Sequence, residues 1–234
     1  MLFRSRWECN GFLVLPEALS APERERLTSA ADHHFSRLRS EYRERSPGTF
    51  QHASLLEGTE AFDLLIWHPA VCGIVDDLLG GDATFVETSM IRKEAGTPTH
   101  AGWHRDLAPS SVYHAASTLA VSAIHYLTDV EPHGGPLAVV PGSHKFPFPL
   151  PDVADLEQMP YFERLAAPAG TVILFHGALW HAAMPNRSER RRVTIHQYYV
   201  HRWMKTTGHT RIPERLYQSI AGDPFRERLI YRPA

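Results

Sequence analysis

Three residues of this chain are of types that bind a metal ion, and their spacing suggests how they would meet. His104-Arg105-Asp106 is the only His-x-Asp in the sequence, and His181 follows 75 residues after the aspartate, just past an apolar run. In a strand, residues i and i+2 point to the same face, so His104 and Asp106 would project together. Two imidazoles and one carboxylate can occupy one face of an octahedral iron and leave the opposite positions free. The spacing therefore indicates an iron site with room for other ligands.

The same residues also have a plainer explanation. The chain has 15 histidines, so any single histidine is weak evidence for a metal site. Asp106 could simply orient His104 in a surface pair. His176, five residues before His181, is an alternative as the second histidine ligand.

Composition argues against several other classes of protein. With 234 residues, 43% of them hydrophobic, the chain can build a substantial core in one β-rich domain. Charged residues make up 21% and the net charge is −2, so neither a nucleic-acid footprint nor a basic membrane face is expected. Two cysteines, no signal-peptide pattern and no apolar run of about 20 residues favour a soluble cytoplasmic protein.

Helical signals come first along the chain, and strand signals follow. Ser20-Ala21-Pro22-Glu23 is a capping box, and apolar residues at helical spacing then predict a helix over 21–40. The polar stretch 41–50 is expected to be a loop, and a second helical region runs from about 58 to 79, punctuated by Pro69. Short segments rich in β-branched and aromatic residues predict strands at 11–16, 83–92, 117–128, 137–140, 171–175 and 192–201.

This order of elements predicts a fold that is mainly β with flanking helices, a sandwich or jelly roll buttressed by N-terminal α-helices. We expect a single domain over residues 1–234. Its parts are a helical portion at about 20–80, a β core at about 83–203 and a C-terminal extension at 204–234.

Several short motifs occur in one order that resembles a known family. They are His104-Arg105-Asp106, Gly134-Gly135-Pro136-Leu137, Pro141-Gly142-Ser143-His144-Lys145, Gly170-Thr171-Val172, His181, Pro185-Asn186, Ser188 and Arg192. Each motif alone is loose, but the ordered set, over residues 11–203, resembles the phytanoyl-CoA dioxygenase family of Fe(II)/2-oxoglutarate-dependent oxygenases. The family fold is a cupin-like double-stranded β-helix, which agrees with helices followed by strands.

The resemblance implies a role for each metal-binding residue. His104, Asp106 and His181 would be the iron ligands. The positions of Pro185-Asn186 and Arg192 select His181 over His176 as the distal histidine.

The resemblance also implies how 2-oxoglutarate would be held. Arg192 would bind its distal carboxylate, because a guanidinium is permanently charged and offers a bidentate fork. Thr194, on the same face of the expected strand, would add a hydroxyl. Arg190 and Arg191 are neighbours, so Arg192 could instead belong to a solvated basic turn. Ala183 stands where many relatives carry a serine that reaches the co-substrate, which would weaken the hold by about 1 kcal/mol.

The implied protein is a dioxygenase that uses Fe(II), 2-oxoglutarate and O₂ to hydroxylate a small-molecule metabolite, with release of succinate and CO₂. Related halogenases lack the carboxylate and place chloride there, so the presence of Asp106 favours hydroxylation. Two alternatives stay open from the sequence. One is an iron oxygenase that works without 2-oxoglutarate, and the other is a non-catalytic metal-binding jelly-roll protein.

The substrate is the part that the sequence determines least. Residues expected near it are Trp103, Trp180, Glu87, Ser89 and His52, although the two tryptophans could equally belong to the core. Segment 145–165 is rich in proline and acidic residues and is long enough to form a lid. No basic groove dedicated to coenzyme A is evident, so a small metabolite is favoured.

Overall fold

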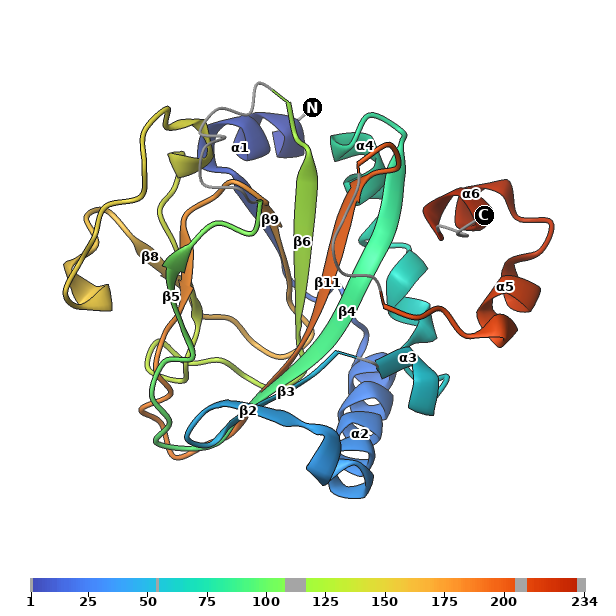
Figure 1. Cartoon of the computed structure of the whole chain (residues 1–234), viewed down its shortest axis with the longest axis horizontal. Helices are drawn as coiled ribbons and strands as arrows, with labels where there is room; N and C mark the ends of the chain where they lie inside the picture. The colour runs from blue at the N-terminus through green and yellow to red at the C-terminus, as the bar shows by residue number, and fades with distance from the viewer. Residues whose placement is uncertain (1, 54, 108–116, 205–209, 231–234) are drawn as a thin grey trace.

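The computed structural model describes residues 2–53, 55–107, 117–204 and 210–230. Their strands form two antiparallel sheets, with the smaller sheet on the left in Figure 1 and the long strands of the larger sheet at the centre. The larger sheet has the order β1-β9-β6-β11-β4-β3-β2. Its strands are β1 Phe12–Leu15, β2 Arg43–Ser46, β3 Thr49–His52, β4 Ala83–Lys93, β6 Ala120–Tyr126, β9 Val172–His176 and β11 Arg192–His201. The smaller sheet has the order β5-β10-β7-β8, with β5 Ala101–His104, β7 Leu137–Val139, β8 Glu163–Leu165 and β10 His181–Ala183.

Apolar side chains fill much of the space between the two sheets. Ile124 of β6 and Phe175 of β9 share a buried cluster with Leu137 of the smaller sheet. Their neighbours Ala123 and Leu174 belong to the cluster on the opposite face of the larger sheet, as strand alternation requires. The larger sheet is therefore covered on both faces.

Helices cover the outer face of the larger sheet. They are α1 Leu2–Asn10, α2 Ala21–Arg37, α3 Leu55–Gly58, α4 Cys72–Leu78, α5 Glu214–Ile220 and α6 Pro224–Leu229, with short 3-10 helices at Arg39–Glu41, Asp63–Trp67, Ser143–Lys145 and Leu156–Gln158. Leu27 and Ala31 of α2 and Val75 of α4 lie in one buried cluster with Ile195 of β11. Among the described residues, no helix combines the length and the apolar character needed to cross a bilayer.

The structure confirms the predicted fold class, which is mainly β with helices before the strands. The helix expected over 21–40 is α2, and its capping box is formed. The long strands expected at 83–92 and 192–201 are β4 and β11, which pair along their length. α2 carries a helical apolar period, and β4 and β11 are rich in β-branched and aromatic residues, so their local sequence agrees with the fold.

The prediction of a loop at 41–50 is wrong, because this stretch contributes strands β2 and β3 of a hairpin. The hairpin turns at Pro47-Gly48, where Gly48 has a φ of 75°. β2 is the edge strand of the larger sheet, and its side chains are mostly exposed. Edge strands are commonly polar, so β2 has no apolar alternation to reveal it.

The helical region expected at 58–79 is interrupted. It holds the 3-10 helix Asp63–Trp67 and the helix α4, with Pro69 between them. Proline lacks the N–H that a continuous helix would need, so the chain turns there instead.

The C-terminal extension packs onto the body of the fold rather than standing apart. Leu229 and Ile230 belong to the same buried cluster as Leu27 of α2. Ile230 also forms a β-bridge with Phe85 of β4.

Candidate active site

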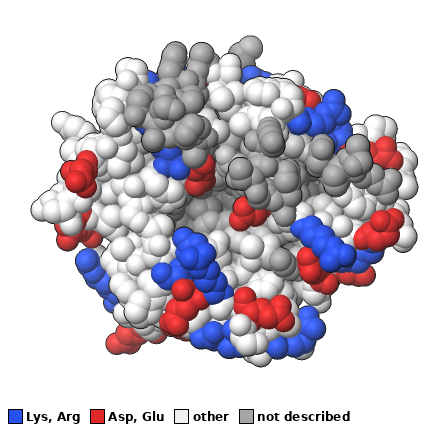
Figure 2. Space-filling view, viewed as in Figure 1, with Lys and Arg blue, Asp and Glu red and all other residues white. Residues whose placement is uncertain are grey.

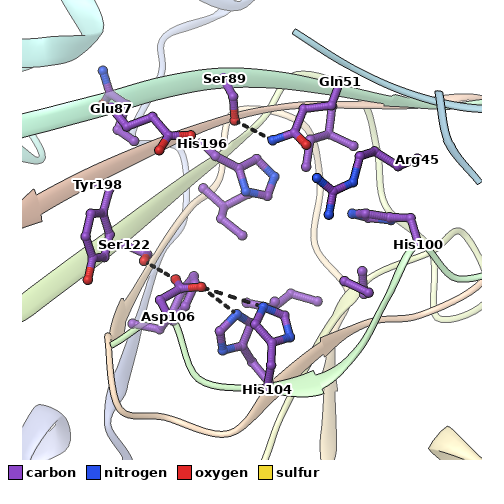
Figure 3. Close-up of a pocket in the computed structure, with 18 of the residues that line it drawn as sticks. Arg45, Gln51, Glu87, Ser89, His100, His104, Asp106, Ser122, His196 and Tyr198 are labelled. Atoms are coloured by element: carbon purple, nitrogen blue, oxygen red, sulfur yellow. Dashed lines mark hydrogen bonds and ion pairs between the residues drawn. The ribbon is translucent and has the colours of Figure 1, made fainter. Parts of the chain in front are cut away.

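A cavity of about 310 Å³ lies between the two sheets. Strands of both sheets contribute side chains to its wall, several of them polar (Figure 3). The lining residues are Arg45, Gln51, Glu87, Ser89, Ile91, His100, Ala101, His104, Asp106, Ser122, Ile124, Leu137, Phe175, His181, Ala183, Arg192, His196, Gln197 and Tyr198.

His104, Asp106 and His181 meet in this cavity. The Nε2 atoms of His104 and His181 lie 3.6 Å and 3.4 Å from Oδ1 of Asp106. One ligand atom from each of the three residues lies within 4.8 Å of the others, and this is the only such group of three or more among the described residues. The strands explain the meeting, because His181 at the start of β10 is the cross-strand partner of His104 at the end of β5.

Two details differ from the expectation. Asp106 lies in a bend just after β5 rather than in the strand itself, yet its carboxylate still reaches both imidazoles. His181 begins a strand rather than lying in a turn, since β10 is only three residues long and carries little periodic signal.

Hydrogen bonds orient all three side chains for a metal ion. The Nδ1 atoms of His104 and His181 lie 2.7 Å and 3.0 Å from the carbonyl oxygens of Gly102 and Leu179. A carbonyl can only accept, so each Nδ1 carries the hydrogen and each Nε2 presents a lone pair to the cavity. Ser122 Oγ donates to Oδ2 of Asp106 over 2.6 Å, which leaves Oδ1 for a cation.

The charge states of the three residues suit the binding of a cation. Burial opposes charge on Asp106, but His181 and His104 hold the pKa of its carboxyl well below the usual range. Burial alone would lower the pKa of His104, whereas the neighbouring Asp106 raises it above its usual value. An anionic carboxylate beside two imidazole lone pairs fits a divalent iron.

His176, the alternative distal ligand, points away from the cavity. It is the last residue of β9, and its neighbour Phe175 lines the cavity, so alternation turns His176 to the other face. There its ring packs against Trp7 and His144, and its Nδ1 accepts a hydrogen bond from the Ala178 N–H.

Arg192 lies in the cavity wall and is 2% exposed. Its Nη2 donates to Thr194 Oγ1 over 3.1 Å, whereas Nε and Nη1 have no hydrogen-bond partner among the described residues. A buried guanidinium with two unsatisfied donors is costly unless an anion completes it. Arg190 and Arg191, by contrast, are 73% and 40% exposed, so Arg192 is not part of the solvated turn.

A second buried cation lies beside Arg192, and sequence reasoning missed it. Lys93 of β4 is the cross-strand partner of Arg192 and is fully buried. Its Nζ donates to the carbonyl oxygen of Met184. Burial and the neighbouring Arg192 lower the pKa of Lys93 to about 7. The alternation Glu87, Ser89, Ile91, Lys93 along β4 would have placed it on the cavity face.

The structure separates the five residues that were expected near the substrate. Glu87 and Ser89 line the cavity. Trp103 and Trp180 do not, because they pack in a separate apolar cluster with Phe146, Leu150, Val153, Met159 and Phe162. His52 also lies outside the cavity, where its ring packs against His34 and Tyr42.

Segment 145–165 does not act as a lid in this structure. Five of its apolar side chains (Phe146, Leu150, Val153, Met159 and Phe162) belong to the cluster around the two tryptophans, and Trp103 Nε1 donates to the carbonyl oxygen of Leu156. None of its residues lines the cavity.

Several cavity residues had no signal in the sequence. Arg45 and Gln51 come from the hairpin that was expected to be a loop, and His100 comes from the segment before β5. His196 and Tyr198 could have been found, because they follow Arg192 and Thr194 at intervals of two along β11.

Comparisons with known proteins agree with this geometry. The family profile described as phytanoyl-CoA dioxygenase (PhyH) matches residues 7–194. L-proline trans-4-hydroxylase of Streptomyces griseoviridis is 27% identical, covering 81% of this chain and 82% of that protein. Ectoine dioxygenase of Stutzerimonas stutzeri (strain A1501) is 24% identical, covering 84% and 75%.

Solved structures share the fold. The non-haem α-ketoglutarate-dependent epimerase SnoN from nogalamycin biosynthesis superimposes with a TM-score of 0.70 at 22% identity, over 84% of this chain and 79% of that chain. HygX of Streptomyces hygroscopicus, with nickel, 2-oxoglutarate and hygromycin B bound, also has a TM-score of 0.70, at 20% identity over 88% and 96%. At these sequence identities the structural similarity supports the jelly-roll fold alone.

Proposed function

This chain belongs to the phytanoyl-CoA dioxygenase family, and from that premise we propose that it is an Fe(II)- and 2-oxoglutarate-dependent dioxygenase that hydroxylates a small-molecule metabolite. One observation carries the proposal. A single cavity holds both the cluster of His104, Asp106 and His181 and the unsatisfied guanidinium of Arg192. The cluster suits a metal ion, and the guanidinium suits a carboxylate.

His104, Asp106 and His181 would hold the iron through the two Nε2 atoms and Oδ1 of the carboxylate. Bound Fe(II), with 2-oxoglutarate and O₂, supplies the oxidising chemistry: one oxygen atom enters a substrate C–H bond, the other enters succinate, and CO₂ is lost. The protein fixes the tautomer of both imidazoles and keeps the second carboxylate oxygen engaged by Ser122.

Arg192 would bind the distal carboxylate of 2-oxoglutarate, and Lys93 would add a second positive charge beside it. Two buried cations side by side repel each other, and an anion between them would remove that cost. Thr194 accepts from Arg192 and lies 3.0 Å from Nε2 of His196, so we propose that it orients the guanidinium. Ala183 offers no hydroxyl, and its carbonyl oxygen is already engaged by Thr99.

The cavity volume supports a small substrate. At about 310 Å³ it lies at the low end of the range for ligand sites, roughly 300–1,000 Å³, and 2-oxoglutarate would occupy part of it. Figure 2 shows charges of both signs mixed across one face of the molecule, rather than a continuous basic tract that would suit coenzyme A. The relatives named for L-proline and ectoine act on molecules of that modest size.

We propose that the whole chain is one catalytic domain and that it works in the cytoplasm. The main buried cluster draws on residues from Trp7 to Ile230, which supports a single unit. Cys9 and Cys72 are both free, which suits a reducing compartment.

The test is turnover of a set of small-molecule metabolites with Fe(II), 2-oxoglutarate and O₂ in a chloride buffer. Succinate should form only with both co-substrates present, and mass spectrometry should find a product that has gained one oxygen atom. A chlorinated product would contradict the role of Asp106 as a ligand. Turnover without 2-oxoglutarate would favour the other class of iron oxygenase, and metal binding without any turnover would favour a binding protein.

The role of Arg192 is tested by comparing the 2-oxoglutarate requirement of Arg192→Ala with that of Arg190→Ala. Loss of a charge-assisted bidentate partner worth about 2–3 kcal/mol should raise the 2-oxoglutarate concentration for half-saturation about 30- to 150-fold. Arg190→Ala removes an exposed arginine two residues away and should leave that concentration unchanged. Equal effects of the two variants would mean that another residue binds the distal carboxylate of 2-oxoglutarate.

A further inference from the structure

Glu87 is a carboxylate in the cavity wall that the proposed reaction does not use. It lies on β4, opposite Tyr198 of β11, so both side chains face the cavity. Figure 3 shows the Glu87 carboxylate directed inward, with the His196 ring beside it. The residue is only partly exposed.

No described residue forms a hydrogen bond or an ion pair with the Glu87 carboxylate. Ser89, the next residue on the same face, is instead engaged by Gln51 Nε2 over 3.3 Å. The carboxylate is therefore presented to the open space of the cavity, where a ligand can reach it. A cation or a strong hydrogen-bond donor is the group that a carboxylate in this position would bind.

The protein places its own cations in the cavity away from Glu87. Among the described lining residues only Arg45 and Arg192 carry a permanent positive charge. Arg192 is six residues from Tyr198 along β11, a rise of roughly 20 Å. Arg45 lies on the opposite side of the view from Glu87 in Figure 3. Neither arginine is placed to neutralise this carboxylate.

A resident metal ion is also an unsuitable partner for Glu87. The only group of three or more potential ligand residues within the described chain is His104, Asp106 and His181. Glu87 alone would leave an ion with a single protein ligand. A cation that binds Glu87 would then come with the substrate.

We propose that the substrate carries a protonated amine, and that Glu87 binds this ammonium group beside the metal-binding residues. This inference rests on the proposed function. Tyr198, opposite Glu87, is in turn the cross-strand partner of Ser122, whose hydroxyl donates to Asp106. An ammonium held at Glu87 therefore brings the carbon atoms next to it toward the metal site. The substrate class is a small aliphatic amine or amino acid, hydroxylated at a carbon a few bonds from nitrogen.

The test uses n-butylammonium and 1-butanol, two probes of similar shape that differ in charge. Each is titrated into the protein with Fe(II) and 2-oxoglutarate under anaerobic conditions, and the midpoint of thermal unfolding is measured. In the wild type, n-butylammonium should raise the midpoint at concentrations where 1-butanol does nothing. Glu87→Gln should weaken n-butylammonium binding at least tenfold, and Glu87→Asp, which keeps the charge, should retain part of it.

Glu131→Gln is the matched control, since it removes an exposed carboxylate outside the cavity and should bind n-butylammonium as the wild type does. Equal responses to both probes, no response to either, or unchanged binding in Glu87→Gln would overturn the proposal. The rise in the unfolding midpoint caused by 2-oxoglutarate alone distinguishes a failure of the Glu87 proposal from a failure of the proposed function. If it is present in wild type and Glu87→Gln, the variant is folded and any failure concerns Glu87. If it is absent from the wild type, the proposed function fails instead.

Discussion

At the scale of single residues, the candidate site depends on backbone atoms as much as on the side chains that would bind the metal. The carbonyl oxygens of Gly102 and Leu179 each accept from the Nδ1 of a histidine two residues later. Each histidine is thereby turned so that Nε2 faces the cavity. Residue types and spacing could therefore predict which side chains meet, but the tautomers and orientations follow only from the folded backbone.

The first residue-scale prediction separates the two candidate distal histidines. His181→Ala removes one of three ligand atoms and should abolish binding of Fe(II) at micromolar concentrations, measured by anaerobic calorimetry. His176→Ala should leave the affinity within about threefold of wild type, because His176 lies on the other face of β9 and does not reach the cavity. The reverse pattern would overturn the assignment of His181.

The substrate residues show where reasoning from neighbours in sequence fails. Trp103 and Trp180 each precede a candidate metal-binding histidine, and both pack in a separate apolar cluster rather than in the cavity wall. Glu87 and Ser89 were found because two residues of one strand share a face. Periodicity was the reliable guide here, and proximity in sequence was not.

At the scale of elements, the sequence predicted strands where apolar, β-branched or aromatic residues form a run, and these include the long β4 and β11 and the three-residue β7. The other strands of the smaller sheet, β5, β8 and β10, have three or four residues each and contain no such run. So short a segment carries too little pattern to be distinguished from a turn. The part of the smaller sheet that holds His104 and His181 was therefore the least visible in the sequence.

The element-scale prediction concerns the start of α2, the helix that covers the larger sheet. Ser20 Oγ accepts from the Glu23 N–H, and the Glu23 carboxylate accepts from the Ser20 N–H over 2.9 Å. Ser20→Ala should lower the free energy of unfolding by about 1 kcal/mol, measured by urea denaturation. Ser36→Ala, an exposed change near the end of the same helix, should have little effect. An equal loss in both variants would show that the capping box contributes nothing specific.

At the scale of the whole molecule, the fold buries several histidines outside the candidate metal site. His34, His125, His144 and His176 are each at most 3% exposed. Burial lowers the pKa to about 4 for His34, His125 and His144, and to about 3 for His176. The composition displayed the number of histidines but not their burial, which depends on how the helices and sheets pack.

These histidines should make the metal-free protein sensitive to acid. Below pH 6.5, the ordinary pKa of histidine, these side chains become protonated in the unfolded chain. In the folded protein they stay neutral down to about pH 4. Acidification between these two values therefore favours unfolding. Asp63 acts in the opposite direction, because burial raises its pKa to about 6 and the folded state then holds the extra proton. The four histidines outweigh the one aspartate, and His100 and His196 of the cavity wall, whose pKa burial lowers to about 2 and to about 3, act in the same direction, so unfolding near pH 5 takes up several protons.

The measurement is the free energy of urea unfolding of the metal-free protein between pH 7.5 and pH 5. Stability should already fall as the pH is lowered from 7.5 to 7, because the pKa of Lys93 is lowered to about 7 in the folded protein, and it should fall with increasing steepness below pH 6.5. His144→Gln removes a buried histidine whose ring nitrogens have no side-chain partner, so the slope near pH 5 should decrease by about one proton. His33→Gln removes an exposed histidine and should leave the slope unchanged. A slope of zero in the wild type, or equal slopes in His144→Gln and the wild type, would mean that these histidines are protonated in the folded protein and that packing does not keep them neutral.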